Sequence, residues 1–103
     1  MKITELGTII AERELEGHLN EQSCKVTVKI GKPFPDPNDK LCWYCPYSIS
    51  TPTGEHMLYA AGVDSLQTLR LAIRQIDAEL TAFYAELKLT WLGGTDLGFS
   101  GFL

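Results

Sequence analysis

One helical segment, residues 64–90, constrains the fold of this chain more than any other part of the sequence. Within it, apolar residues recur at alternating steps of three and four positions, which places them on one face of an α-helix. They are Leu66, Leu69, Ile73, Ile76, Leu80, Phe83 and Leu87. Asp64 with Gln67 three positions later matches a capping box, and Gly93-Gly94 is typical of a helix C-terminal cap. The pattern predicts one long helix that docks through this face.

A second apolar stripe lies on roughly the opposite side of the same helix, at about 100° per residue. Its members are Leu71, Ala78, Ala82, Ala85 and Leu89. One stripe is enough to dock a helix on its own domain, so the second indicates a helix–helix contact with a partner. The alternative is that alanine, the best helix former, stands exposed at little cost, and that Leu71 and Leu89 are ordinary surface leucines.

The chain before this helix has the alternation of β-strands. We expect strands at 3–15, 24–30, 41–50 and 55–62, with turns at 16–22 and 51–54. The clearest is 24–30, in which apolar residues alternate with Lys25, Thr27 and Lys29. Two lysines of this strand are expected to face Glu12 and Glu14 across the first hairpin.

Two features of the sequence modify these expected strands. Arg13 interrupts the apolar face of the first strand, which suggests that this strand reaches a rim of the sheet. The residues from 32 to 40 include three prolines, which exclude a helix or a central strand there, so we expect a loop.

The predicted fold class is α+β: a four-stranded antiparallel meander packed on one face by a single long C-terminal helix. We expect a single domain over residues 1–103, with an apolar Gly/Phe tail at 95–103 that is free to be flexible. A helix of about 26 residues would be ~39 Å long, and strands of eight residues only ~27 Å. The helix should therefore overhang the sheet, and the overhang needs cover from the tail or from another chain.

Charge and composition exclude several function classes. The net charge is −4 and the pI near 5.0, which argues against nonspecific nucleic-acid binding and against anionic membranes. The N-terminus lacks the apolar region of a signal peptide, and no apolar run approaches the ~18 residues of a membrane span. Three cysteines do not make a complete disulfide framework. We expect a cytoplasmic protein that binds neither nucleic acid nor membranes.

Cys42 and Cys45 have the spacing of a metal or redox motif, but their context does not fit. A structural zinc ion needs four ligands, and a redox pair needs its first cysteine at a helix N-terminus. Residues three apart on a strand point to opposite faces. We therefore predict structural cysteines, and no catalytic, cofactor-binding or metal-binding residue.

Two surfaces are candidates for binding. The first is an interface made by the second helical stripe together with Phe99 and Phe102 of the tail. The second is a ligand surface between the Pro-rich loop 32–40 and the aromatic hairpin 43–59, with Phe34, Tyr44 and His56 as its residues.

Two strings of residues resemble a known family. Cys45-Pro46-Tyr47-Ser48-Ile49, followed by Gly62-Val63-Asp64-Ser65-Leu66-Gln67 at the helix start, resembles a family of small bacterial proteins of unknown function. The resemblance covers most of residues 24–90. It implies a bacterial cytosolic origin and a strand-rich half followed by a helix, and it implies no catalytic residues.

Taken together, these patterns predict a non-enzymatic protein-interaction module, either a homodimer or an adaptor or immunity-like protein that binds another protein. The alternative is a small-molecule-binding or enzymatic site between the loop 32–40 and the hairpin 43–59, which requires a concave pocket there. A zinc or redox protein that uses Cys42 and Cys45 ranks last.

Overall fold

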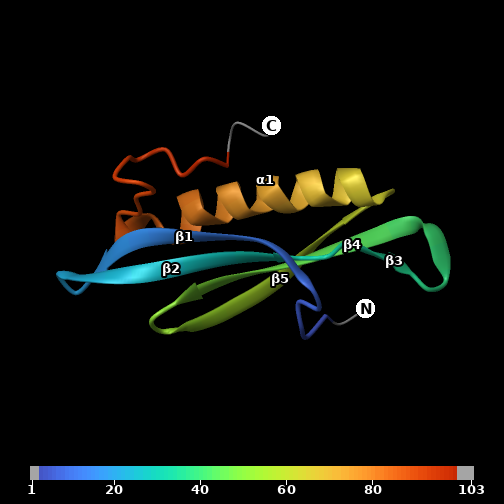
Figure 1. Cartoon of the computed structure of the whole chain (residues 1–103), viewed down its shortest axis with the longest axis horizontal. Helices are drawn as coiled ribbons and strands as arrows, with labels where there is room; N and C mark the ends of the chain where they lie inside the picture. Colours follow the sequence, from blue (N-terminus) through green and yellow to red (C-terminus); the bar gives the residue numbers. More distant parts are fainter. Residues whose placement is uncertain (1–2, 100–103) are drawn as a thin grey trace.

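The computed structural model describes residues 3–99, and it has five strands and one long helix (Figure 1). The strands form one antiparallel sheet and the helix packs on one of its faces, so the predicted α+β class is confirmed. The elements are β1 (Ile9–Leu19), β2 (Gln22–Gly31), β3 (Phe34–Asp36), β4 (Asp39–Thr51), β5 (Gly54–Gly62), α1 (Ser65–Phe83) and the 3₁₀-helix η1 (Ala85–Leu87).

The four long strands neighbour one another in chain order, as a meander requires, and β3 is an additional fifth strand. One edge of β4 pairs first with β3 and then with β2, while its other edge pairs with β5. The sequence predicted a loop at β3. The prolines exclude a central strand, but Phe34 and Pro35 pair as an edge strand, where a missing N–H costs nothing.

The first hairpin is longer than predicted. We expected a turn over 16–22, but β1 continues to Leu19 and a two-residue turn, Asn20-Glu21, joins it to β2. Both turn residues have positive φ, 53° and 67°, as a type I′ turn demands. Lys25 lies 3.2 Å from the Glu14 carboxylate and Lys29 lies 3.9 Å from that of Glu12, so the predicted cross-strand pairs are confirmed.

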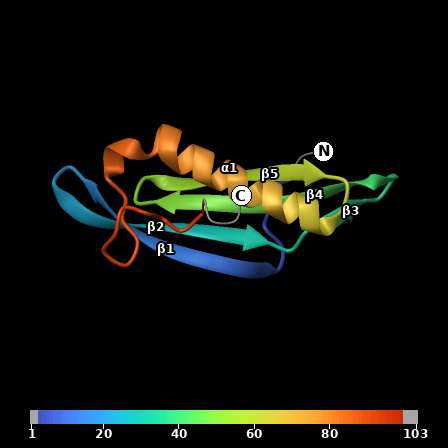
Figure 2. The same cartoon turned by 90° about the horizontal axis from the view of Figure 1, so that it is seen from above.

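The core lies between the inner face of the sheet and two covering elements (Figure 2). The helix lies over β4 and β5, whereas the segment after it returns over β1 and β2. The buried apolar residues are Leu15, Val26, Val28, Ile30, Cys45, Tyr47, Ile49, Ala60, Ala72, Ile76, Leu80 and Phe99.

The buried face of α1 is rotated from the predicted one. Leu66 and Phe83 are 76% and 78% exposed, whereas Thr68 and Ala72 are fully buried. The contact line follows i, i+4 steps from Thr68 to Leu80, and it begins against Gly62, where an added Cβ would lie 2.6 Å from the Thr68 hydroxyl. Two members of the predicted stripe stand near the helix ends, outside this line.

The start of α1 was predicted correctly, but its end was not. Asp64 accepts a hydrogen bond from the Gln67 backbone N–H at 2.7 Å, and the Gln67 side chain accepts one from the Val63 N–H at 2.8 Å. The helix ends at Phe83 rather than near residue 90, because the chain turns back through η1 and a left-handed Lys88. This turn brings Leu87 and Leu89 against the core, where a straight continuation would carry them away from the sheet.

The expected overhang of the helix is also corrected by these lengths. The 19 residues of α1 span ~28 Å, and the 13 residues of β4 are longer than that at ~3.3 Å per residue. Gly93 does not cap the helix. Gly93 and Leu92 have φ of 83° and 52° and form the tip of a tight turn in which Trp91 and Gly94 exchange two backbone hydrogen bonds.

Candidate functional site

The predicted helical interface divides into covered and uncovered residues. Leu71 and Leu89 are half-buried and pack against the core of their own chain. Ala78, Ala82 and Ala85 are exposed. The leucines that a partner was expected to cover therefore already have cover, and what remains of the second stripe is its alanines.

Of the two tail residues in that prediction, the structure describes Phe99. Phe99 is only 5% exposed and belongs to the core of its own chain. Phe102 lies outside the described residues.

The segment from Thr90 to Phe99, here called the C-terminal strap, closes the inner face of β1 and β2. Thr90 exchanges two backbone hydrogen bonds with Glu16 of β1, of 2.8 and 2.9 Å. Arg13 is its central anchor. Its guanidinium lies 3.9 Å from the centre of the Trp91 ring and 5.0 Å from that of Phe99, and it donates to the Leu97 and Gly98 carbonyls at 3.1 Å each.

We call the contact of Arg13 with Trp91, Phe99 and the two strap carbonyls the clamp. The sequence analysis did not predict it. Arg13 does interrupt an apolar face, but it points into the molecule under the strap and does not mark a bare rim. The usable signal was one inward-facing cation on a strand together with the aromatic residues Trp91 and Phe99 in a glycine-rich tail, because a cation is attracted to the face of an aromatic ring.

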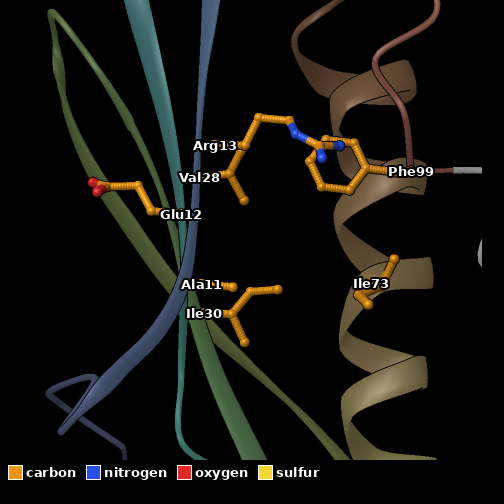
Figure 3. A pocket seen from close by; sticks show the side chains of 7 residues that line it. All are labelled: Ala11, Glu12, Arg13, Val28, Ile30, Ile73 and Phe99. Atoms are coloured by element: carbon orange, nitrogen blue, oxygen red, sulfur yellow. The ribbon is translucent and has the colours of Figure 1, made fainter.

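A small apolar hollow remains beside the clamp (Figure 3). Val28 and Ile30 of β2 point toward Ile73 of the helix, Phe99 closes one end, and Glu12 points away to the outer face. The volume is about 120 Å³, which is small beside the roughly 300–1,000 Å³ of ordinary ligand sites. We interpret it as a packing gap between the helix and the strap.

The predicted ligand surface is partly assembled. Phe34 and Tyr44 are opposite one another on β3 and β4, with ring centres 5.6 Å apart. Tyr59 of β5 joins them, edge-on to Tyr44 at 5.6 Å. His56 does not, because it pairs with Ile49 near the opposite end of β5 and faces the helix side of the sheet. We call the group of Phe34, Tyr44 and Tyr59 the aromatic row.

Asp36 completes the aromatic row on its β3 side. The Tyr44 hydroxyl donates to one Asp36 carboxylate oxygen at 2.6 Å, and the Asn38 backbone N–H donates to the other at 2.8 Å. These bonds favour the charged form, so the pKa of Asp36 is lowered, while the bond to Asp36 raises the pKa of Tyr44. At neutral pH Asp36 is therefore a charged carboxylate and Tyr44 beside it a neutral phenol.

A larger hollow lies at the Pro-rich loop. The N-terminal segment 3–8 and Lys32–Pro35 form its walls together with Trp43, and its volume is about 660 Å³. The Lys32 N–H donates to the Thr8 carbonyl at 2.7 Å and joins the two walls. Phe34 lines this hollow, whereas Tyr44 and His56 are absent from its walls.

A polar cluster lies under the helix. Tyr47 is fully buried, and its hydroxyl accepts a hydrogen bond from the Gln75 amide at 3.0 Å. Desolvation raises the pKa of Tyr47 to about 12 and also raises the pKa of Glu79, while the nearby His56 acts in the opposite direction on Glu79. Because Gln75 also donates to the Tyr59 carbonyl, this cluster ties α1 to β5.

The cysteines are free thiols, and Cys42 and Cys45 lie on opposite faces of β4. Cys45 belongs to the inner, buried face of β4 and Cys42 to the face of Tyr44, as strand alternation predicts. Among residues 3–99, no group of three or more His, Cys, Asp or Glu residues is arranged to hold a metal ion. Burial raises the pKa of the Cys45 thiol to about 11.

The comparison with known families matches nearly the whole of this structure. Residues 11–101 match the family model described as Domain of unknown function (DUF6968). The chain belongs to this family. The match includes most of β1 and the strap, and the sequence resemblance, drawn over most of residues 24–90, covered neither β1 nor the strap beyond Thr90.

The remaining comparisons add limits. No curated protein and no solved structure matches the chain. Within the described residues, no helix is both long and apolar enough to span a lipid bilayer.

Proposed function

We propose that this DUF6968 member is a non-enzymatic protein-interaction module of the bacterial cytoplasm that associates with a second copy of itself. Three apolar side chains at one end of the molecule carry this proposal. Leu41, Val63 and Leu66 are 73%, 53% and 76% exposed. Leu41 is near the start of β4, Val63 follows the end of β5, and Leu66 is in the first turn of α1. These three element ends lie close together (Figure 2). We call Leu41, Val63 and Leu66 the hairpin-end residues.

The size of the hairpin end indicates a weak association. Burying a Leu or Val side chain contributes about 1.5–3 kcal/mol, so six such side chains in a symmetric dimer contribute roughly 10 kcal/mol or more. The loss of translational and rotational freedom costs about 4–15 kcal/mol. We therefore expect a dimer with a Kd of micromolar to millimolar order.

Sedimentation equilibrium up to about 1 mM chain tests the proposal. The mass should rise toward two chains, and the double variant Leu41→Lys, Leu66→Lys should stay at one. A matched control exists at the other end of the molecule, because Phe83 and Leu92 are at least as exposed. Phe83→Lys, Leu92→Lys should associate like the unmodified protein. A single-chain mass for the unmodified protein, or equal loss in both variants, would contradict the proposal.

The larger hollow supports a second candidate, a small-molecule site. Its volume of about 660 Å³ falls within the usual range for ligand pockets, and Pro33, Phe34 and Trp43 give it apolar walls. A titration with the apolar dye anilinonaphthalene sulfonate, followed by the NMR signals of the two indole groups, tests it. Binding at this site shifts the Trp43 signal and leaves Trp91 unchanged. A shift of Trp91 alone, or none, would rule it out.

A further inference from the structure

The aromatic row lies on the face of the sheet opposite the helix. Residues of β4 alternate, and Tyr47 and Ile49 face the core, so Tyr44 faces the other way. Phe34 lies directly opposite Tyr44 in the register, and Tyr59 pairs with Pro46, two residues along from Tyr44 on the same face. Three rings therefore cross three neighbouring strands in one row. Tyr59 is 41% exposed, and Phe34 and Tyr44 are half-buried.

A carboxylate beside this row defines its electrostatics. Asp36 accepts one hydrogen bond from Tyr44 and one from the Asn38 backbone, and the Asp39 backbone also favours its charged form. Aromatic ring faces carry partial negative charge. The chain has a net charge of −4, which favours a cationic ligand here over the phosphates of a nucleic acid.

We propose that the aromatic row and Asp36 bind an arginine side chain of a partner protein. A guanidinium is planar, stacks on ring faces and can donate two parallel hydrogen bonds to a carboxylate, which an ammonium does not. The same chain holds one arginine in a comparable manner, with Arg13 stacked on Trp91 and bonded to two carbonyl oxygens. The proposal adds the chemistry of a partner on a surface other than the hairpin-end residues.

A short peptide is a suitable probe. We would titrate acetyl-Gly-Arg-Gly-Arg-Gly-amide into the protein and follow the ring signals of Tyr44 and Tyr59 by NMR, with the glutamine analogue of the peptide as a reference. The arginine peptide should shift these rings with a millimolar Kd that weakens as salt is raised. Absence of these shifts, or equal shifts with the glutamine peptide, would overturn the proposal.

Variants separate this site from nonspecific attraction. Tyr59→Leu and Asp36→Asn should each weaken binding about two- to fivefold. Phe83→Leu removes an exposed ring elsewhere, and Glu55→Gln removes an exposed carboxylate that accepts from Ser50. Neither control should change the Kd, and an equal loss in the controls would refute a specific site.

Two further outcomes assign the row to another ligand class. Shifts of Tyr44 and Tyr59 by cellotriose, or by an eight-nucleotide thymidine strand, without shifts by the arginine peptide would replace the proposal with a sugar or nucleic-acid platform. The titration is repeated on the Leu41→Lys, Leu66→Lys variant. Peptide binding by that variant supports the site even if the chain does not self-associate, so the two proposals fail separately.

Discussion

Gly98→Ala should lower the free energy of unfolding by about 3 kcal/mol, because Gly98 holds the strap against Arg13. Its φ is +80°, in the region that only glycine enters without cost. A Cβ built there would lie 2.6 Å from Cζ3 of Trp91 and 2.7 Å from Nη1 of Arg13. Neither neighbour is a loose surface chain, because each is held by the other and by the strap.

The magnitude has two parts. A left-handed alanine costs about 1 kcal/mol. Relieving the contact requires the Trp91 ring and the Arg13 guanidinium to separate, which forfeits a cation–π contact of about 0.5–2 kcal/mol and weakens one charge-assisted hydrogen bond of roughly 1.5 kcal/mol. These terms sum to about 3 kcal/mol if the strap stays docked in part.

Urea denaturation followed by circular dichroism measures this loss, and the NMR signal of the Trp91 indole reports the strap itself. Gly93→Ala is a matched control, since Gly93 also has positive φ, +83°, but its Cβ would meet nothing within 4 Å. That variant should lose only about 1 kcal/mol. If the two variants differ by less than about 0.5 kcal/mol, which is near the error of such measurements, Gly98 does not act through the clamp.

Three other perturbations follow from particular contacts. Glu21→Gly should stabilise the protein by about 0.5–1 kcal/mol in urea denaturation, because the type I′ turn holds Glu21 at a φ of 67°; a loss of stability would contradict the turn. Asp64→Ala should cost about 1 kcal/mol through loss of the helix cap, and thermal melting would show no change if the cap were unimportant. Alkaline pH should destabilise the fold between about 9 and 12, because burial raises the pKa of Cys45 to about 11 and of Tyr47 to about 12. The unfolded chain releases these protons first, so stability falls as pH rises, and a flat urea midpoint across this range would refute the assignment.

The strand half of the fold was predictable because alternation is a local signal. Val26, Val28 and Ile30 alternate with Lys25, Thr27 and Lys29, and a strand with one solvent-facing and one buried face has few other ways to arrange them. The cap at Asp64 was predictable for the same reason, since its partner Gln67 is three residues away.

The end and the rotation of the helix were not predictable from periodicity. The apolar spacing continues through Leu87, but the helix stops at Phe83 because Leu87 and Leu89 gain more contact by turning back to the core. Likewise Thr68 is fully buried because it packs against Gly62 of β5. The spacing of apolar residues cannot predict a buried threonine. Both outcomes depend on where the helix crosses the sheet.

The sequence predicted some residues of the candidate site correctly and one wrongly. Phe34 and Tyr44 were identified from composition, and their contact follows from the β3–β4 pairing. His56 was wrongly joined to them, because Tyr59 rather than His56 lies on the Tyr44 face of β5. The apolar residues of this strand, 57–61, are consecutive, so alternation could not show which residues of β5 face the helix.

The width of the sheet explains why the chain needs its strap. One helix is about 10 Å wide, which covers roughly two strands at ~4.8 Å spacing, here β4 and β5. The inner face of β1 and β2 needs a second cover, and the strap that carries Trp91 and Phe99 supplies it. The helix starts beside the hairpin end and the strap lies toward the opposite end of the sheet (Figure 2), and Leu41 near the start of β4 stays 73% exposed. Any partner that completes this fold should therefore add apolar surface at the hairpin end and not along the alanines of the helix.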